Sequence, residues 1–194
     1  MRILRAGDYR RMPWKNGGGV TTEIIVAPEG AALDNFDWRV SMAHVASDGP
    51  FSLFPGIDRT LAVLSGSGIR LRVDGLGETA LTQAAAPFAF PADVAASADL
   101  IDGPITDLNV MSRRGVLRHA LTRTTISQPL RIAAPVDALL VLTRGGGATI
   151  KAGMALETLA DGDSVLLTAG DAEAVLTPAS TLTLYRAEFR YGSG

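Results

Sequence analysis

The chain has 194 residues, a formal net charge of −2, a pI near 5.7 and no cysteine. It therefore has no disulfides, thiolate nucleophiles or sulfur metal ligands, and its 18 scattered lysines and arginines argue against a nucleic-acid-binding protein. The charged start lacks the apolar stretch of a secretion signal. The longest apolar runs, such as residues 138–142, are far shorter than a membrane span. These features predict a cytoplasmic protein without membrane association.

The first unusual segment, residues 12–23, places a lysine beside three glycines. A phosphate-binding loop is disfavoured because the lysine precedes the glycines and β-branched residues follow where a helix should begin. A tight turn at Asn16–Gly17 that enters a strand is favoured, since glycine permits a positive φ or a close backbone approach. Lys15 and Asn16 are candidates for ligand contacts, with a solvated lysine as the alternative for Lys15.

Alternation with period two recurs along the chain, whereas helical periodicity is hard to find. In the segment that follows, Trp38 and Val40 share one face, and Arg39 and Ser41 share the other. Short segments of this kind are separated by Gly, Pro and Asp at roughly ten-residue intervals. The pattern predicts an all-β sandwich or barrel.

The loop at residues 49–60 combines two aromatics, two prolines and an Asp–Arg pair. Arg59 has the same parity as Leu61 and Val63, so it enters the barrel if those two residues face the interior. An interior guanidinium needs a partner, and its fork matches a carboxylate. Asp58 has the opposite parity and cannot easily supply that carboxylate. The open alternative is that Arg59 ties the loop together through carbonyls or another acid.

The segment at residues 102–114 is a further candidate for the barrel wall. Asn109 and Met111 share one strand face, and an asparagine inside a barrel must form a hydrogen bond. Arg113 and Arg114, at the end of this strand, are interpreted as a solvated pair.

A weak internal repeat relates the two halves of the chain. A shift of 78 residues places residues 61–64 on 139–142 and aligns hairpin glycines and core aliphatics. Coincidence in a chain rich in Leu and Gly is the alternative. The repeat predicts an N-terminal lobe at residues 1–115 and a C-terminal lobe at 116–194. The same shift puts Asp137 opposite Arg59, so we expect one anion site and one ligand per chain.

Catalytic and metal-binding patterns are scarce. The two histidines, His44 and His119, are far apart and have no metal-ligand spacing. No nucleophile elbow is present, and residues 161–163 are interpreted as a turn. We therefore predict no metal, no cofactor and no catalytic residue.

Several segments together resemble the HutD/Ves family of bicupin proteins. They are residues 13–19, 22–24, 38–41, 49–59, 64–68 and 103–114. The resemblance implies a jelly-roll, or double-stranded β-helix, repeated twice. In ordinary cupins the loop before the Leu61 strand carries metal-binding histidines and a glutamate. Here Phe51, Ser52, Phe54 and Arg59 occupy that neighbourhood, so a guanidinium could replace the metal as the anchor of a ligand carboxylate.

The resemblance also implies a function. HutD proteins are associated with histidine utilisation, which predicts a non-catalytic, regulatory binder of a small carboxylate such as N-formylglutamate or urocanate. The Ves branch implies a stress-response role instead. The predicted ligand-binding residues are Lys15, Asn16, Ser41, Phe51, Phe54, Arg59, Asn109 and Met111.

Two other classes of function stay open from the sequence. One is a metal-independent isomerase or hydrolase that uses His44, Glu23 or Asp58 as its base. The other is an interaction module whose exposed strands pair with a partner. A homodimer also stays open.

Overall fold

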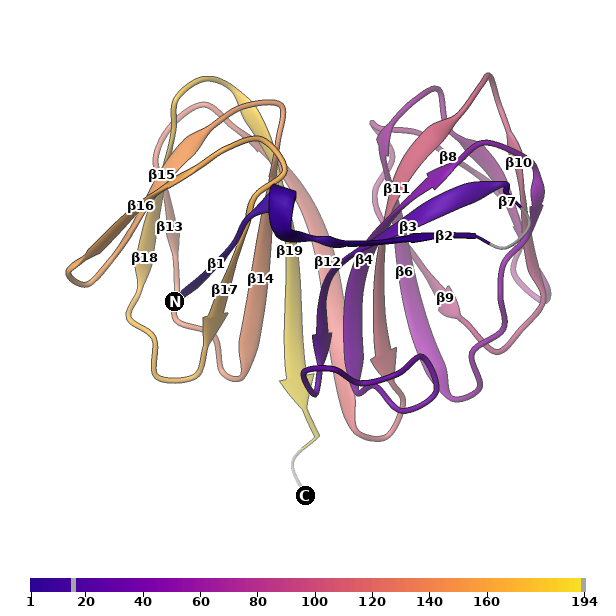
Figure 1. Ribbon diagram of the computed structural model, residues 1–194, viewed down its shortest axis with the longest axis horizontal. Coiled ribbons are helices and arrows are strands. Elements are labelled where there is room, and N and C mark those ends of the chain that lie inside the picture. The colour runs from indigo at the N-terminus through magenta and orange to yellow at the C-terminus, as the bar shows by residue number, and fades with distance from the viewer. Residues whose placement is uncertain (15–16, 193–194) are drawn as a thin grey trace. The chain divides into compact units, whose positions relative to one another are not determined.

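The computed structural model describes residues 1–14 and 17–192, and these residues form strands almost throughout. The short 3-10 turn η1 (Ala6–Asp8) is the helical element shown in Figure 1. No helix in the described part of the chain is long and apolar enough to cross a bilayer. The chain forms two compact units: an N-terminal lobe, Arg10–Arg118, and a C-terminal lobe of Met1–Tyr9 with the chain from His119 onward.

The N-terminal lobe consists of two antiparallel sheets. One has the order β2-β3-β4-β11-β6-β9 and the other the order β5-β10-β7-β8. The strands are β2 (Arg10–Pro13), β3 (Gly19–Ala27), β4 (Trp38–Val45), β5 (Gly49–Pro50), β6 (Ile57–Ser65), β7 (Ile69–Val73), β8 (Gly77–Leu81), β9 (Phe88–Pro91), β10 (Ala96–Leu100) and β11 (Ile105–Arg113).

The C-terminal lobe also has two sheets, with the orders β1-β17-β14-β19-β12 and β13-β18-β15-β16. Its strands are β1 (Arg2–Leu4), β12 (Leu117–Ile126), β13 (Leu130–Ile132), β14 (Ala138–Arg144), β15 (Ala148–Ala152), β16 (Ala155–Leu159), β17 (Ser164–Thr168), β18 (Ala174–Pro178) and β19 (Leu182–Tyr191).

The two lobes repeat one strand order. The run β9-β6-β11-β4 recurs as β17-β14-β19-β12, and β5-β10-β7-β8 recurs as β13-β18-β15-β16. The predicted offset of 78 residues relates Gly77–Leu81 to Ala155–Leu159 and Ala96–Leu100 to Ala174–Pro178. The all-β prediction is confirmed, and the repeated order of strands agrees with a jelly-roll present twice.

The first nine residues differ from the predicted lobe at 1–115, because they lie with the C-terminal lobe. β1 pairs with β17, with Arg2 opposite Leu166. Contacts more than 150 residues apart in sequence hold this segment, and no local pattern in the sequence indicates them. The described structure therefore divides the chain differently at its N-terminus.

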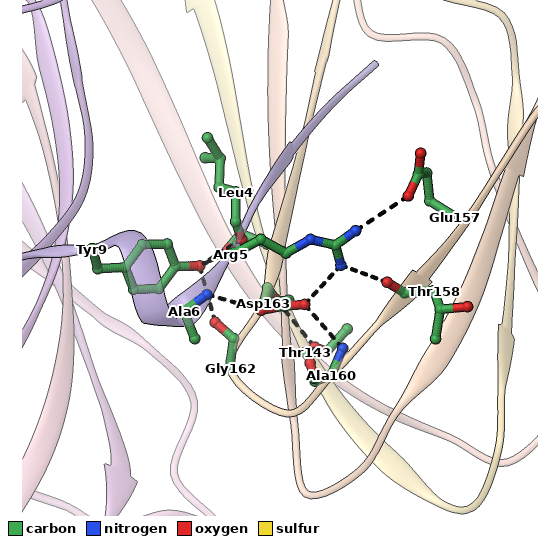
Figure 2. A network of polar contacts seen from close by, with 11 residues as sticks. Leu4, Arg5, Ala6, Tyr9, Thr143, Glu157, Thr158, Ala160, Gly162 and Asp163 are labelled. Atoms are coloured by element: carbon green, nitrogen blue, oxygen red, sulfur yellow. Dashed lines mark hydrogen bonds and ion pairs between the residues drawn. The ribbon is translucent and has the colours of Figure 1, made fainter.

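A polar network fixes the segment after β1 (Figure 2). Asp163 accepts hydrogen bonds from the backbone nitrogen of Ala6 at 2.8 Å and from Arg5 Nη1 at 3.0 Å. The Tyr9 hydroxyl lies 2.9 Å from the Gly162 carbonyl and 2.8 Å from Ser164 Oγ. Burial raises the pKa of Tyr9 to about 12, so its phenol is neutral. The predicted turn at 161–163 is present, and its last residue also anchors the N-terminal segment.

The core of the N-terminal lobe includes two distinct apolar clusters. One contains Leu61 and Val63 of β6 together with Phe90 of β9. The other contains Phe36 and Met111. Polar side chains from β4, β6 and β11 on the same sheet face are buried as well, as described below.

The predicted glycine turn has a steric cause that can be tested. Gly17 has a φ of +72°, and a β-carbon on Gly19 would lie 2.4 Å from the His44 carbonyl oxygen and 2.9 Å from the Trp14 ring. We expect Gly19→Ala to lower the free energy of unfolding by about 1–3 kcal/mol, because β4 cannot move away without breaking its pairing. Gly49→Ala, which meets nothing within 4 Å, is the matched control in denaturant titrations. Equal stability of the two variants would contradict the steric account.

Candidate functional site

The register of three neighbouring strands gathers polar residues on one sheet face. Met111 of β11 lies opposite both Arg39 of β4 and Arg59 of β6. Two residues along β11, Asn109 lies opposite Ser41 and Leu61. Directly opposite residues share a face, and Leu61 belongs to a core cluster. This is therefore the inner face of the sheet.

Arg59 is buried on this face, with 4% of its surface exposed. Its Cζ lies 5.2 Å from the ring centroid of Phe51, 5.4 Å from that of Phe54 and 5.8 Å from that of Phe90. Its Nη2 donates a long hydrogen bond of 3.4 Å to the Ser52 carbonyl. Its Nε is buried and has no hydrogen-bond partner among the described residues.

Arg59 remains a cation despite its burial. Desolvation lowers its pKa to about 10, with attraction to Asp107 opposing this and repulsion by Arg39 adding to it. The guanidinium is thus charged at neutral pH. A buried cation held by aromatic faces and one long hydrogen bond is only partly compensated.

Asp107 is the buried acid whose negative charge attracts the Arg59 guanidinium. It is 1% exposed, and its Oδ1 accepts a hydrogen bond of 2.7 Å from Asn109 Nδ2. Burial raises the pKa of Asp107 to about 7, while Arg59, the backbone of Ala43 and Asn109 favour the charged form. The structure records no ion pair within 4.0 Å between the described residues Asp107 and Arg59. Asp107 therefore acts on Arg59 through space.

A second arginine on the inner face is already paired. Arg39 Nε donates to Glu23 Oε2 at 2.7 Å, and the two side chains are 7% and 14% exposed. Glu23 lies opposite Ser41 in the register of β3 and β4. The neutral Arg39–Glu23 pair leaves Arg59 and Asp107 as the other buried charged groups of this face within the described residues.

The structure brings most of the predicted site residues together. Phe51 and Phe54 flank the Arg59 guanidinium. Asn109 donates a hydrogen bond to Asp107, whose charge attracts that guanidinium. Ser41 is buried at 2% exposure beside Asn109. Met111 lies beside Arg59 and belongs to the apolar cluster of Phe36. The two other predicted residues, Lys15 and Asn16, lie outside the described residues.

The loop that covers Arg59 is anchored at its ends. The backbone nitrogens of Phe51 and Phe54 donate to the carbonyls of Ala96 and Ala92 at 2.9 and 2.8 Å. Arg114 binds Asp58 at 2.7 Å and also pairs with Asp93. Arg114 is exposed, as predicted, but its guanidinium also joins two acids at the base of this loop. Arg113 differs from the predicted solvated pair, because it is half-buried and donates to the carbonyls of Phe36 and Asp34. Between the anchored points, Ser52 and Leu53 are exposed.

The three residues considered as catalytic bases lie in different places. His44 is exposed and lies in the row of Thr106 and Val20, on the face opposite to Arg59. Asp58 forms an ion pair with Arg114. Glu23 is on the inner face and is paired with Arg39. No group of three His, Asp or Glu residues with metal-ligand geometry occurs within residues 1–14 and 17–192.

Two shallow hollows occur elsewhere. One of about 540 Å³ is lined by residues of β5, β7, β8 and β10, and one of about 300 Å³ by residues of β15, β16 and β18. Neither is lined by a predicted site residue.

The C-terminal lobe has a different residue at the position that corresponds to Arg59. Asp137 precedes β14, and its Oδ2 accepts a hydrogen bond of 2.9 Å from the backbone nitrogen of Tyr191. The interior of this lobe contains one large aliphatic cluster that includes Leu139 and Val141. Arg186 of β19 has a buried Nε without a partner among the described residues, but its side chain is only half-buried. One ligand per chain remains our prediction.

Sequence reasoning missed Asp107, Phe90 and the Arg39–Glu23 pair. Asp107 has the same parity as Asn109 and Met111, so the period-two rule could have placed it on the inner face. Phe90 reaches Arg59 because β9 pairs with β6. That pairing has no signal in a single sequence.

Comparison with known proteins gives a family and a fold. The family model described as HutD matches residues 6–184. An uncharacterised 21.2 kDa protein in the hutC 3′ region of Pseudomonas putida is 46% identical over 111 residues, 57% of each chain. Protein Ves of Citrobacter koseri is 40% identical over 114 residues, 55% of this chain and 56% of that one. The aligned part thus spans little more than half the length of these curated relatives.

Solved structures match over nearly the whole chain. HutD from Pseudomonas fluorescens SBW25, solved in a formate condition, is 32% identical, with a TM-score of 0.81 and 99% coverage of both chains. A cupin 2 conserved barrel domain protein from Leptotrichia buccalis is 12% identical, with a TM-score of 0.61 and coverage of 93% of this chain and 96% of that one. The second likeness shows a cupin-like fold alone.

Proposed function

The chain belongs to the HutD family, and we propose that it is a non-catalytic binding protein that holds one small carboxylate at Arg59 and thereby regulates histidine utilisation. Metabolites of that pathway with the required group include N-formylglutamate and urocanate. The carboxylate would accept hydrogen bonds from the guanidinium in place of the Ser52 carbonyl. The aromatic rings around Arg59 would exclude water from the contact.

One observation carries this proposal: Arg59 is a buried cation whose Nε has no partner among the described residues. Burying a charge is costly unless it is paired, and its recorded hydrogen bond is long, at 3.4 Å to a carbonyl. A carboxylate matches the guanidinium fork with two short hydrogen bonds. Binding would therefore satisfy a group that the free lobe leaves partly unsatisfied.

Two relatives guide the choice of ligands to test. The relative from Pseudomonas putida is encoded in the hutC 3′ region, and the HutD structure from Pseudomonas fluorescens was solved in a formate condition. Formate is the smallest carboxylate, so it presents the shared group without any further recognition element.

Isothermal calorimetry tests the proposal. Formate, urocanate and N-formylglutamate should each bind with a stoichiometry of one, and formate should bind most weakly because it makes only the contact to Arg59. One charge-assisted contact contributes about 1.5–3 kcal/mol, so we expect formate to bind in the millimolar range or weaker. The absence of heat from all three carboxylates at millimolar concentrations would contradict the proposal.

A further inference from the structure

Resting on the proposed carboxylate site, we infer that Asp107 is a second ligand anchor, which selects carboxylates that carry an N–H donor at the end remote from the carboxylate. Arg59 would hold the carboxylate, and Asp107 would accept a hydrogen bond from an imidazole, pyrrole or amide N–H. Asp107 then determines specificity within the class of small carboxylates.

The charges of the inner face favour one carboxylate at Arg59 and disfavour a second carboxylate beside Asp107. Arg39 and Glu23 neutralise one another at 2.7 Å. Arg59 is therefore the buried cation of this face, among the described residues, that lacks a direct acidic partner. One carboxylate on the ligand would compensate the positive charge of Arg59. A second carboxylate near Asp107 would meet a like charge, which is unfavourable in a low-dielectric interior.

The polar residues next to Arg59 favour an N–H group on the rest of the ligand. Asp107 lies opposite Val63 and Arg59 lies opposite Met111 in the β6–β11 register, so both buried side chains are on the inner face of the sheet. Asp107 accepts from Asn109 and from the Ala43 backbone. A carboxylate has about four acceptor positions, so these contacts leave it able to accept another hydrogen bond.

Two matched probes isolate this interaction. 3-(Pyrrol-2-yl)acrylate and 3-(2-furyl)acrylate have nearly the same shape and the same carboxylate, but the first has a ring N–H where the second has a ring oxygen. Neither ring titrates near neutral pH. At pH 8 the wild-type protein should bind the pyrrole about tenfold more tightly than the furan, the ratio expected for one hydrogen bond to a carboxylate. Calorimetry or ligand-observed NMR gives both dissociation constants.

The variant Asp107→Asn assigns the preference to one residue. In this variant the pyrrole should bind no more tightly than the furan, because the carboxamide carries its own N–H donors. The furan should still bind. Asp74→Asn, an exposed acid beside the β7–β8 turn, should keep the wild-type ratio. The wild-type comparison needs no variant, so it decides the inference even if Asp107→Asn does not fold.

The outcomes separate the inference from the proposed function. If both probes bind the wild-type protein equally well, or if Asp107→Asn keeps the preference, Asp107 is not an anchor and the carboxylate site stands. If neither probe nor formate binds, the carboxylate site itself is wrong and the inference falls with it. A tenfold preference that disappears only in Asp107→Asn supports both.

Discussion

Arg59→Met should weaken the binding of every carboxylate by at least about 30-fold while the protein stays folded. Removing one partner of a buried, hydrogen-bonded charge pair costs about 2–5 kcal/mol of binding free energy, and 2 kcal/mol corresponds to roughly 30-fold. Methionine keeps the unbranched stem of arginine without its charged guanidinium, and its thioether packs well against aromatic rings. The four groups around it, Phe51, Phe54, Phe90 and the Ser52 carbonyl, would keep an apolar or weakly polar contact.

The control for this variant is Arg70→Met. Arg70 lies on β7 with its side chain exposed, whereas its neighbours Ile69 and Leu71 are buried. It should change neither the calorimetric affinity nor the melting temperature beyond a small shift. Carboxylate binding that survives in Arg59→Met would contradict the proposed site. Unfolding of Arg59→Met as its main effect would make Arg59 a structural residue instead.

The second large effect concerns the dependence of stability on pH. The pKa of Asp107 rises from 3.8 to about 7 in the folded protein because the carboxyl is buried. The folded state therefore holds a proton that the unfolded state loses between these two values, and the free energy of unfolding falls as pH rises through this window. Three pKa units correspond to about 4 kcal/mol. Above pH 7 the contribution of Asp107 to the free energy of unfolding no longer changes with pH.

Asp107→Asn removes this dependence, because the carboxamide mimics the protonated acid. The variant should match the wild type in stability near pH 4 and exceed it by up to about 4 kcal/mol near pH 8. Acids with lowered pKa values, such as Asp163 and Asp171, affect both proteins equally and cancel in the difference. Urea titrations across this range give the difference directly. A variant less stable than the wild type at pH 8 would show that attraction to Arg59 outweighs the cost of burial.

One physical rule, the alternation of side chains along a strand, predicted from the sequence both the strands and the interior position of Arg59. A strand turns alternate side chains to opposite faces, so Leu61 and Val63 determine the side on which Arg59 lies. The same rule excluded Asp58 as its partner, and the structure pairs Asp58 with Arg114. Asn109 was expected to form a hydrogen bond on the inner face, and it donates one to Asp107.

The rest depends on which strands are neighbours, and a single sequence does not encode that in local patterns. Phe90 contacts Arg59 through the β6–β9 pairing, and Arg39 finds Glu23 across β3 and β4. The first nine residues lie in the C-terminal lobe through contacts such as Ala6 to Asp163, which are 157 residues apart. Such pairings follow from the assembled sheets.

The Nε–Hε signal of Arg59 in a proton–nitrogen NMR spectrum reports most directly on whether this guanidinium binds a carboxylate. Its absence from the Arg59→Met spectrum identifies it. During a titration with urocanate the signal should shift and saturate at the dissociation constant that calorimetry gives, because the unpaired Nε–H gains an anionic acceptor. A signal that stays in place while calorimetry reports saturation would mean that the carboxylate binds elsewhere.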